Sequence, residues 1–508
     1  MVRSHQRRKR VSSLAILAVL SCGHVAVGQP PPGFVDASTF GGGFNPSDST
    51  SALQAAIESG SDVWVPNMGT DWNVTPIFLT QSNQTILFEE GVVVAAKPGA
   101  FLGTHDNLFT NTTRVNVRLE GYGATLRMRQ QDYIAPPYPP NPEFRMGISA
   151  LTVDGFEIVG LTIENTGGDG IYISDTNPTD PNERSQNVLI QDVVIDNAYR
   201  NGISISSASG VVIDNVVIAS SSGHAPQAGI DLEPDTDMQP VENITIRNSI
   251  MVGNFDRGIV WSLKNTPSIP DVTGTVENLT IIGNGNDGLD MAEESLPGWT
   301  IKDSLIIDNF GAGFSVLTDC QVANCSTPFA IEYSALFGNL LGALEGTAAL
   351  GTGSITTAEP DFVAQFVSTD LHHPYFMYLE PTTPTAIRQG ASDGKFMGAR
   401  PVLWTGDMDG DGLVTNADVP WFIQAWANRT AYDANGFTTP GGDPINADLN
   451  GDLDRNGVFD SGDIKVWNTL LAAAAAAAAV PEPDAAILCV AAALTGLLSK
   501  SRRQRASP

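Results

Sequence analysis

The chain is 508 residues long and carries a formal net charge of -29 at pH 7, although only 16% of its residues are charged. A surface with this acidic excess repels nucleic acids and anionic membranes, which argues against both as partners. An acidic substrate would need a cation or a local basic patch to bridge it to the protein. The length leaves room for one large domain and one small one.

Residues 1–28 have the three parts of a secretory signal peptide. A basic run at 7–10 precedes an apolar stretch at 14–20, and small residues at 26–28 provide a cleavage site. The apolar stretch is too short for a membrane-spanning helix. We therefore expect export across the inner membrane, with a mature chain that begins at Gln29.

Residues 48–57 predict a capped amphipathic helix, which is followed by an apolar strand at 63–66. This arrangement resembles the N-terminal cap of pectate-lyase-like β-helix proteins. A helix at this place would cover the open end of the apolar core, as solenoids require.

A glycine-apolar phrase recurs six times in the middle of the chain. Its spacings are 32, 27, 29, 30 and 25 residues, and its glycines are Gly170, Gly202, Gly229, Gly258, Gly288 and Gly313. Periods of this length indicate solenoids or propellers. Three short alternating strands per period, as at 188–190, 193–197 and 202–205, favour a right-handed parallel β-helix. We predict a mainly β chain whose solenoid, with its helical cap, spans 29–402.

One copy of the phrase, at 228–233, carries two carboxylates on one strand. Alternate strand residues face opposite sides, so Ile230 and Leu232 should point into the core while Asp231 and Glu233 point outward. Like charges two apart on one strand repel each other, which favours a cationic group nearby. Alignment of the copies predicts one outward ladder, which consists of Tyr172, Ser204, Asp231, Val260, Asp290 and Ser315.

Basic residues lie in the coils on both sides of the acidic pair. Arg200 stands just before the preceding strand, Arg257 stands at the entrance of the following strand, and Lys264 comes a few residues later. The candidate catalytic residues are Asp231, Glu233, Arg200 and Arg257. The candidate substrate-binding residues are Asp169, Tyr172, His224, Asp235, Asp290 and Lys264.

Two outward carboxylates beside guanidinium groups are compatible with three chemistries. A glycosidase would use one as an acid and the other as a nucleophile or base. A lyase or epimerase would hold Ca²⁺ against a uronate in the groove and remove the C5 proton with an Arg or Lys. A non-catalytic groove would only hydrogen-bond sugar hydroxyls. In the plainest interpretation Asp169, Asn201 and Asp287 cap turns, because Asn/Asp-Gly is typical turn chemistry, and the arginines are their ion-pair partners.

The block 140–262, which includes the copies at 169–173 and 228–233, resembles a phrase shared by many secreted bacterial β-helix proteins. These proteins are carbohydrate-active or of unassigned function. The resemblance implies an extracellular polysaccharide as the partner and a hydrolase or lyase as the enzyme class. The chain has neither the Gly-His-Gly of polygalacturonases nor the Asp-Pro-His of mannuronan epimerases. A surface adhesin or scaffold protein is the alternative.

Two twelve-residue stretches, 407–418 and 452–463, have the ligand spacing of EF-hand calcium loops, and each precedes an apolar helical pattern. They resemble a type I dockerin, a small α-helical module placed here at 403–471. The resemblance implies Ca²⁺ as the cofactor and a cohesin-bearing protein as a partner. The loops begin 45 residues apart, farther than in dockerins, so a calcium-stiffened spacer is the alternative. The predicted ligands are Asp407, Asp409, Asp411, Leu413, Asp418, Asp452, Asp454, Asn456, Val458, Asp460 and Asp463.

Residues 472–508 begin with eight alanines and continue with Pro481-Glu482-Pro483, an apolar stretch at 485–498 and a basic end. This order resembles the PEP-CTERM sorting tail of Gram-negative bacteria. It implies processing by an exosortase and a location at the cell surface or in the extracellular matrix. An ordinary tail anchor is the alternative, and the basic end stays cytoplasmic in either case.

Overall fold

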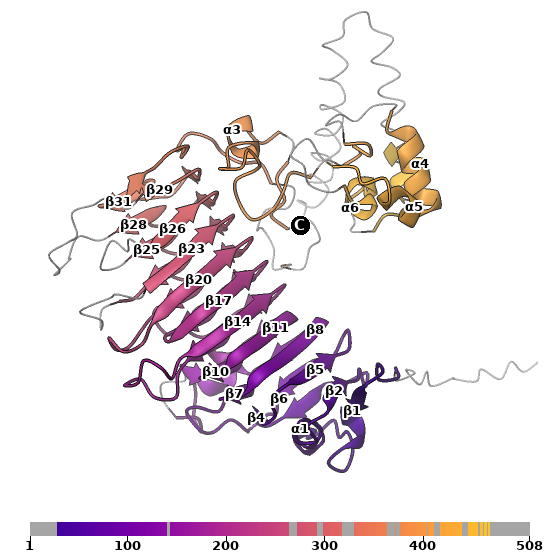
Figure 1. Ribbon diagram of the computed structural model, residues 1–508, viewed down its shortest axis with the longest axis vertical. Coiled ribbons are helices and arrows are strands. Elements are labelled where there is room, and N and C mark those ends of the chain that lie inside the picture. The colour runs from indigo at the N-terminus through magenta and orange to yellow at the C-terminus, as the bar shows by residue number, and fades with distance from the viewer. Residues whose placement is uncertain are drawn as a thin grey trace, which may run out of the picture.

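Parallel strands wind into a solenoid that leads into a small helical domain (Figure 1). The computed structural model describes residues 28–139, 143–263, 272–291, 298–316, 330–362, 371, 376–380, 382–403, 405–410, 417–438, 445–455, 458–460, 462–464 and 466–467. The predicted signal peptide and sorting tail lie outside these residues. Within them, no helix is long and apolar enough to cross a membrane.

One wall of the solenoid is a ten-stranded parallel sheet, to which each coil contributes one short strand. Its strands are β4 (Ile77–Leu79), β7 (Phe109–Thr112), β10 (Ile148–Leu151), β13 (Ile171–Ser174), β16 (Ile203–Ile205), β19 (Ile230–Leu232), β22 (Ile259–Trp261), β25 (Leu289–Met291), β28 (Phe314–Val316) and β31 (Leu344–Gly346).

Most of the other strands form an 18-stranded sheet, in which most coils have two strands or one long bent strand, while β29 (Ala330–Ile331) and β32 (Ala349–Leu350) pair separately. The strands of the 18-stranded sheet are β1 (Phe34–Asp36), β2 (Asp62–Val65), β3 (Trp72–Val74), β5 (Gln84–Phe88), β6 (Val93–Ala96), β8 (Val115–Arg127), β11 (Asp154–Glu164), β14 (Ser185–Gln191), β15 (Val194–Asp196), β17 (Ala208–Asp214), β18 (Val217–Ala219), β20 (Val241–Arg247), β21 (Ile250–Val252), β23 (Val272–Glu277), β24 (Thr280–Ile282), β26 (Trp299–Lys302), β27 (Leu305–Ile307) and β30 (Ala335–Phe337). A coil such as β14–β15–β16 therefore has the three strands that the repeats predict.

The helix predicted near the start of the solenoid is present as α1 (Thr50–Glu58), which follows the 3-10 helix η1 (Ala37–Thr39). Buried side chains of α1, among them Leu53 and Ile57, join the apolar core at the indigo end of the solenoid (Figure 1). The helix thus closes the end of the core that the first coil would otherwise expose.

The repeated glycine marks a close approach between neighbouring coils. In each member of the column Gly147, Gly170, Gly202, Gly229 and Gly258, an added Cβ would lie 2.5–2.6 Å from the carbonyl oxygen of the next glycine. A larger residue would push the coils apart, which explains why the period is visible in the sequence. Gly147 begins a further copy, 23 residues before Gly170, that the six-copy prediction omits.

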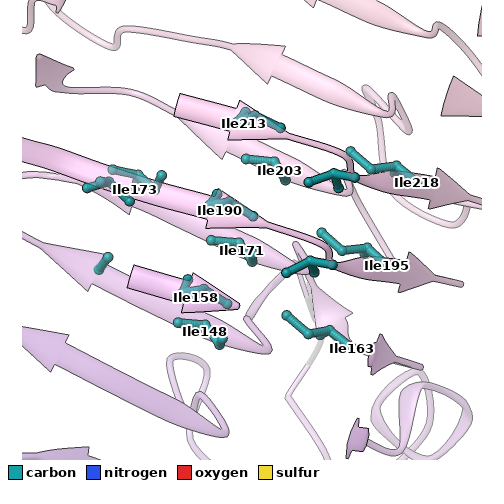
Figure 2. Packing of buried hydrophobic residues seen from close by; sticks show 14 of the residues in the cluster. Ile148, Ile158, Ile163, Ile171, Ile173, Ile190, Ile195, Ile203, Ile213 and Ile218 are labelled. Atoms are coloured by element: carbon teal, nitrogen blue, oxygen red, sulfur yellow. The ribbon is translucent and has the colours of Figure 1, made fainter. Parts of the chain in front are cut away.

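Isoleucines stack in register through the interior of the solenoid, where they are fully buried. Figure 2 shows three such stacks, which are Ile148–Ile171–Ile203, Ile158–Ile190–Ile213 and Ile163–Ile195–Ile218. The inward positions predicted from strand alternation, including Ile230 and Leu232, are likewise fully buried. Apolar burial along these stacks is the main force that holds successive coils together.

A matched pair of substitutions on β20 tests this core. Ile246 is fully buried, whereas its neighbour Thr245 lies on the outer side of the strand and is half-buried. We expect Ile246→Ala to lower the free energy of unfolding by about 2–5 kcal/mol, because it removes apolar contacts and leaves a cavity. Thr245→Ala should cost less than about 1 kcal/mol. Urea unfolding followed by far-UV circular dichroism measures both, and equal losses would contradict this packing.

The segment made of 376–380 and 382–403, here called the C-terminal strap, packs across the outer face of the 18-stranded sheet. It includes helix α3 (Thr385–Arg388), and its apolar side chains cover outward residues of β18, β21, β27 and β30. The backbone amide of Ala399 donates to Thr280 Oγ1 at 3.0 Å, and Ser392 Oγ donates to Asp303 Oδ2 at 2.7 Å. All of this segment except residue 403 falls inside the predicted 29–402 solenoid, but it lies across earlier coils instead of adding another one.

The small domain has its own apolar core, which includes Met408, Phe422, Tyr432 and Trp467. Its helices are α4 (Val419–Ala427), α5 (Arg429–Asp433) and α6 (Ala447–Gly451), and α4 occupies the first helix predicted there. An ion pair joins the domain to the C-terminal strap, since Arg455 Nη1 lies 2.8 Å from Glu380 Oε1.

Candidate functional site

The outward ladder predicted for the ten-stranded sheet is confirmed along its whole length. Tyr172 pairs with Ser204 and Ser204 with Asp231, and the pairing continues through Val260 and Asp290 to Ser315. In the other direction the same ladder reaches Ser149, Thr110 and Phe78 on β10, β7 and β4. Neighbouring strands are spaced by roughly 4.8 Å, so these side chains form a continuous row on one face.

A cavity of about 500 Å³ lies over the first part of this row. It is called the groove below, and it extends from the outer face of β4, β7, β10 and β13 to the residues that follow β16 and β19. The carboxylates that line the groove are Glu143, Glu233 and Asp235. The lining residues therefore combine acidic groups with the outward positions of four coils.

Aromatic rings form the other part of the groove lining. Phe78 is 53% exposed and Phe144 is 40% exposed, so both rings present apolar surface in the groove. His105 stacks on Phe144 with the ring centroids 4.9 Å apart. Tyr172 lies on the ladder between Phe78 and the acidic coil. Such rings offer flat apolar surfaces beside polar groups, the mixture that ligand pockets typically present.

The groove wall that carries Glu143 and Phe144 is held by strand β9 (Phe144–Arg145), which pairs antiparallel with β12 (Gly167–Gly168). The guanidinium of the fully buried Arg145 donates from Nε to the Phe101 carbonyl at 2.8 Å. It lies 5.4 Å from the ring centre of Tyr133, the last residue of helix α2 (Gln130–Tyr133). Arg145 thus anchors this wall to the body of the protein.

Arg200 is surrounded by carboxylates of the protein itself. Its Nη2 bonds to Glu233 and lies 3.9 Å from Asp231 Oδ2, its Nη1 lies 3.4 Å from Asp169 Oδ2, and its Nε lies 3.9 Å from Glu143 Oε2. Burial alone would lower the pKa of Arg200, but the charges of Asp169, Glu233 and Asp231 outweigh it and raise that pKa. The arginine is therefore a fixed cation that holds the acidic groups in place.

Asp231 points away from the core, as predicted, but it is fully buried beneath the groove. Its Oδ2 accepts a hydrogen bond from Asn201 Nδ2 at 3.1 Å, and its Oδ1 accepts one from Ser262 Oγ at 2.8 Å. Burial, reinforced by the charge of Glu233, raises its pKa well above the usual range. The structure places Asp231 where it can support Glu233 and Arg200, and out of reach of a substrate.

In the coil that contains β19, the carboxylates that a ligand in the groove can reach are those of Glu233 and Asp235. The side chain of Glu233 is 28% exposed and that of Asp235 is exposed at the groove edge. Burial, and then the neighbouring charge of Glu233, raises the pKa of Asp235. A carboxyl group with a raised pKa beside an arginine-held carboxylate is the arrangement that separates an acid from a base.

The residues at the strand entrances cap the backbone, as the plainest interpretation predicts. Asp169 Oδ1 accepts from the Asn201 amide at 3.0 Å, Asn201 Oδ1 from the Ala228 amide at 2.9 Å, and Asp287 Oδ1 from the Ala312 amide at 2.6 Å. In each case the amide belongs to the next coil. Asp169 is fully buried, so it cannot contact a substrate as the sequence suggests.

Arg257 does not flank the acidic pair, although its sequence position suggests that it would. Its guanidinium bonds to Asp256 and to Asp290, which lies on the next coil. Asp290 is 1% exposed and, like Arg257, does not line the groove. Side-chain alternation predicts which face a residue occupies, but it does not predict which neighbouring coil a long side chain reaches.

Asp287 lies close to Asp290 and Arg257, and its titration should make the stability of the folded protein depend on pH. Burial raises the pKa of Asp287 to about 6, and the nearby Asp290 adds to the effect. The folded state therefore favours protonated Asp287, and its stabilising contribution is present below pH 3.8 and lost as the pH rises through 6. The loss amounts to at most about 3 kcal/mol.

Asp287→Asn should abolish this part of the pH dependence, because an amide oxygen can still accept from Ala312. We expect the variant to gain stability over the wild type between pH 4 and pH 7.5 in urea unfolding. If the free energies of unfolding of the variant and the wild type differed by the same amount at pH 4 and at pH 7.5, Asp287 would not be the titrating group.

His224 and Lys264 are the remaining predicted substrate-binding residues. His224 lies in an exposed loop with Nδ1 3.0 Å from Glu143 Oε2. Lys264 lies outside the described residues. The groove residues Phe78, His105 and Phe144 are not among the predicted site residues. The copy at Gly147 would have extended the ladder toward Phe78, but no repeat signal marks the other two.

The small domain brings together carboxylates from positions 1, 3 and 12 of each predicted calcium loop. Oxygen atoms of Asp407, Asp409 and Asp418 lie within 4.8 Å of one another, and so do those of Asp452, Asp454 and Asp463. Among the described residues, these two groups are the ones in which three or more His, Cys, Asp or Glu side chains lie close enough to hold a metal ion. All-oxygen carboxylate sets suit Ca²⁺, so the donor set fits the predicted ion.

The other predicted ligands are only partly described. Asp411, Leu413 and Asn456 lie outside the described residues. Val458 and Asp460 are described, and the Asp460 amide donates to Asp463 Oδ2 at 2.7 Å. At position 12, Asp418 Oδ1 accepts from the amides of Met408 and Asp409, and Asp463 Oδ1 accepts from the corresponding amides of the second loop. The two loops therefore close in the same way.

Residues 146–327 match the model of the family described as right handed beta helix region. The chain therefore contains a right-handed parallel β-helix region, in agreement with its parallel sheets. No curated protein is similar enough to this chain to count as a match.

Several solved structures resemble this chain. An exopolygalacturonase from Thermotoga maritima is 14% identical, with a TM-score of 0.39 over 66% of this chain and 94% of that one. The A-module of a mannuronan C-5 epimerase from Azotobacter vinelandii is 16% identical, with a TM-score of 0.37 over 64% and 99%. The tailspike protein of E. coli bacteriophage HK620, in complex with a pentasaccharide, is 12% identical, with a TM-score of 0.42 over 64% and 65%. Residue roles in the groove rest on the geometry described above.

Proposed function

We propose that the protein is an exported carbohydrate-active protein whose groove binds and hydrolyses an extracellular polysaccharide. The observation that carries the proposal is the composition of the groove. A cavity of about 500 Å³ combines the exposed rings of Phe78 and Phe144 with the carboxylates of Glu233 and Asp235. Aromatic faces suit the apolar faces of sugar rings, and carboxylates suit their hydroxyl groups.

Hydrolysis fits the acidic groups better than elimination or epimerisation does. Elimination or epimerisation with Arg200 as the base would require this arginine to give up its proton, whereas its pKa is raised by Asp169, Glu233 and Asp231 even against burial. A hydrolase needs one protonated and one ionised carboxyl group. Asp235, whose pKa burial raises, is the proposed acid, and Glu233, held by Arg200, is the proposed nucleophile or base.

The alternative is a non-catalytic surface adhesin or scaffold protein that binds a glycan in the same groove. One observation favours this alternative. Asp231, which lies two residues before Glu233, is fully buried, and both of its carboxylate oxygens accept hydrogen bonds, from Asn201 and Ser262. The acidic strand therefore does not present two reachable carboxylates, and catalysis requires Asp235 from beyond its end.

Incubation of the purified protein with a panel of polysaccharides tests the proposal. New reducing ends without unsaturated products support hydrolysis, and unsaturated products would show a lyase instead. Binding in affinity electrophoresis without any new ends would favour the adhesin. Absence of both binding and cleavage across the panel would overturn the groove as a carbohydrate site.

The C-terminal domain is proposed to bind two Ca²⁺ ions through its twin loops and, as a dockerin-like module, a cohesin-bearing partner. The two groups of aspartates support the calcium part of this proposal. Export by the signal peptide, processing by an exosortase and display at the cell surface are proposed from the end segments alone.

A further inference from the structure

The only lysine or arginine among the described residues that line the groove is Arg200. Each nitrogen of its guanidinium faces a carboxylate of the protein, from Nε beside Glu143 to Nη2 bonded to Glu233. Its side chain is only 14% exposed. The groove therefore offers a ligand no free guanidinium with which a carboxylate or sulfate could form the usual bidentate pair.

The charges that do face the groove are mainly negative. Glu143, Glu233 and Asp235 line it, and Asp169 and Asp231 lie buried behind Arg200. His105 is stacked on Phe144 and hydrogen-bonded to Thr104 Oγ1 through Nδ1, and His224 lies beside Glu143. An anionic sugar would have to enter this field and displace a carboxylate from Arg200, which like-charge repulsion opposes.

A bridging metal ion would be the other way to accept an anionic sugar. The described groups of three or more metal-ligating side chains that are close enough to hold one ion lie in the small domain, and no such group of three is described in the groove. The groove residues are instead those that hydrogen-bond hydroxyl groups and stack on sugar rings, such as Ser149, Thr110 and Phe78.

We infer that the groove selects a polysaccharide that carries no carboxylate or sulfate groups. This inference rests on the proposed function and names the substrate class of the same site. The shared chemistry is a hydroxyl-rich sugar chain without acidic groups, and such a chain can be neutral or can carry amino groups. The acidic lining explains how a protein with this β-helix architecture excludes uronates without any blocking side chain.

Affinity electrophoresis at low salt tests the inference with defined probes. Neutral xylan, mannan and β-glucan are compared with polygalacturonate, alginate and carrageenan, each with and without Ca²⁺. We expect at least one neutral probe to bind at least about tenfold more tightly than every anionic probe. Chitosan distinguishes a neutral sugar chain from one that carries amino groups. Binding driven by amino groups weakens strongly with added salt, whereas binding of a neutral chain does not.

Anionic probes that bind as tightly as the neutral ones, with or without Ca²⁺, would overturn the inference and leave the carbohydrate function standing. No binding by any probe would overturn the proposed function itself. These two failures are therefore distinguishable in one experiment.

The variant Glu143→Gln supplies a second test, because it frees Arg200 Nε and removes one negative charge from the lining. We expect the affinity for polygalacturonate, relative to the best neutral probe, to rise by about tenfold. Asp235→Asn should shift the ratio in the same direction and serves if the first variant does not fold. Glu242→Gln, whose carboxylate lies 3.8 Å from Arg184 on the other sheet, is the control and should leave the ratio unchanged. An unchanged ratio in both groove variants would contradict the electrostatic selection.

Discussion

Glu233→Gln should reduce the rate of polysaccharide cleavage by about 10²–10⁴-fold, the range typical of a lost acid or base. Glu233 is the groove carboxylate bonded to Arg200, and its side chain is partly exposed to a ligand. Glutamine keeps the size and the hydrogen-bonding oxygen but cannot accept a proton or attack as a carboxylate. The affinity for the polysaccharide should change by less than about tenfold, because only one polar contact is altered.

The separation of turnover from binding is the useful readout. Initial rates of reducing-end release give the turnover, and affinity electrophoresis gives the binding. Glu242→Gln is the matched control, since it changes the same side chain beside an arginine on the other sheet. If Glu233→Gln retained the wild-type turnover, Glu233 would not take part in the chemistry, and the roles proposed for this coil would have to be abandoned.

Chelation of Ca²⁺ should unfold the small domain and leave the β-helix folded. Each loop gathers three aspartates, and Asp407, Asp418, Asp452 and Asp463 are fully buried. Without a cation these charges repel one another in a poorly hydrated place. At 1,000 times its dissociation constant a bound ion contributes about 4 kcal/mol, which for a domain of this size corresponds to about 20 °C in melting temperature.

Differential scanning calorimetry with Ca²⁺ or with EDTA should therefore show one calcium-dependent and one calcium-independent transition. Asp418→Asn and Asp463→Asn, which each remove a position 12 carboxylate, should reproduce much of the shift in the presence of Ca²⁺. Asp433→Asn is the control, because this exposed aspartate on α5 lies outside both loops. A transition that EDTA does not move would defeat the calcium proposal.

Much of the β-helix was predictable because its constraints repeat. Gly170, Gly202 and Gly229 are visible as a period since a Cβ at each would collide with the next coil. Alternation predicted that Ile230 and Leu232 point inward, and the register of the copies predicted the partners of Asp231. The C-terminal strap escaped prediction because it has no period, and its apolar residues resemble those of a further coil.

The site was predictable only as a face of the solenoid. Alternation by itself determined that Asp231 and Glu233 share the outward side, since the direction of a strand side chain is a local property. Tertiary structure decided that Asp231 is covered while Glu233 stays reachable, and that Arg257 binds Asp290 instead. It also decided that Phe144 completes the groove. These outcomes depend on loops that differ from coil to coil and on long side chains that choose among several neighbours, and neither leaves a periodic signal in the sequence.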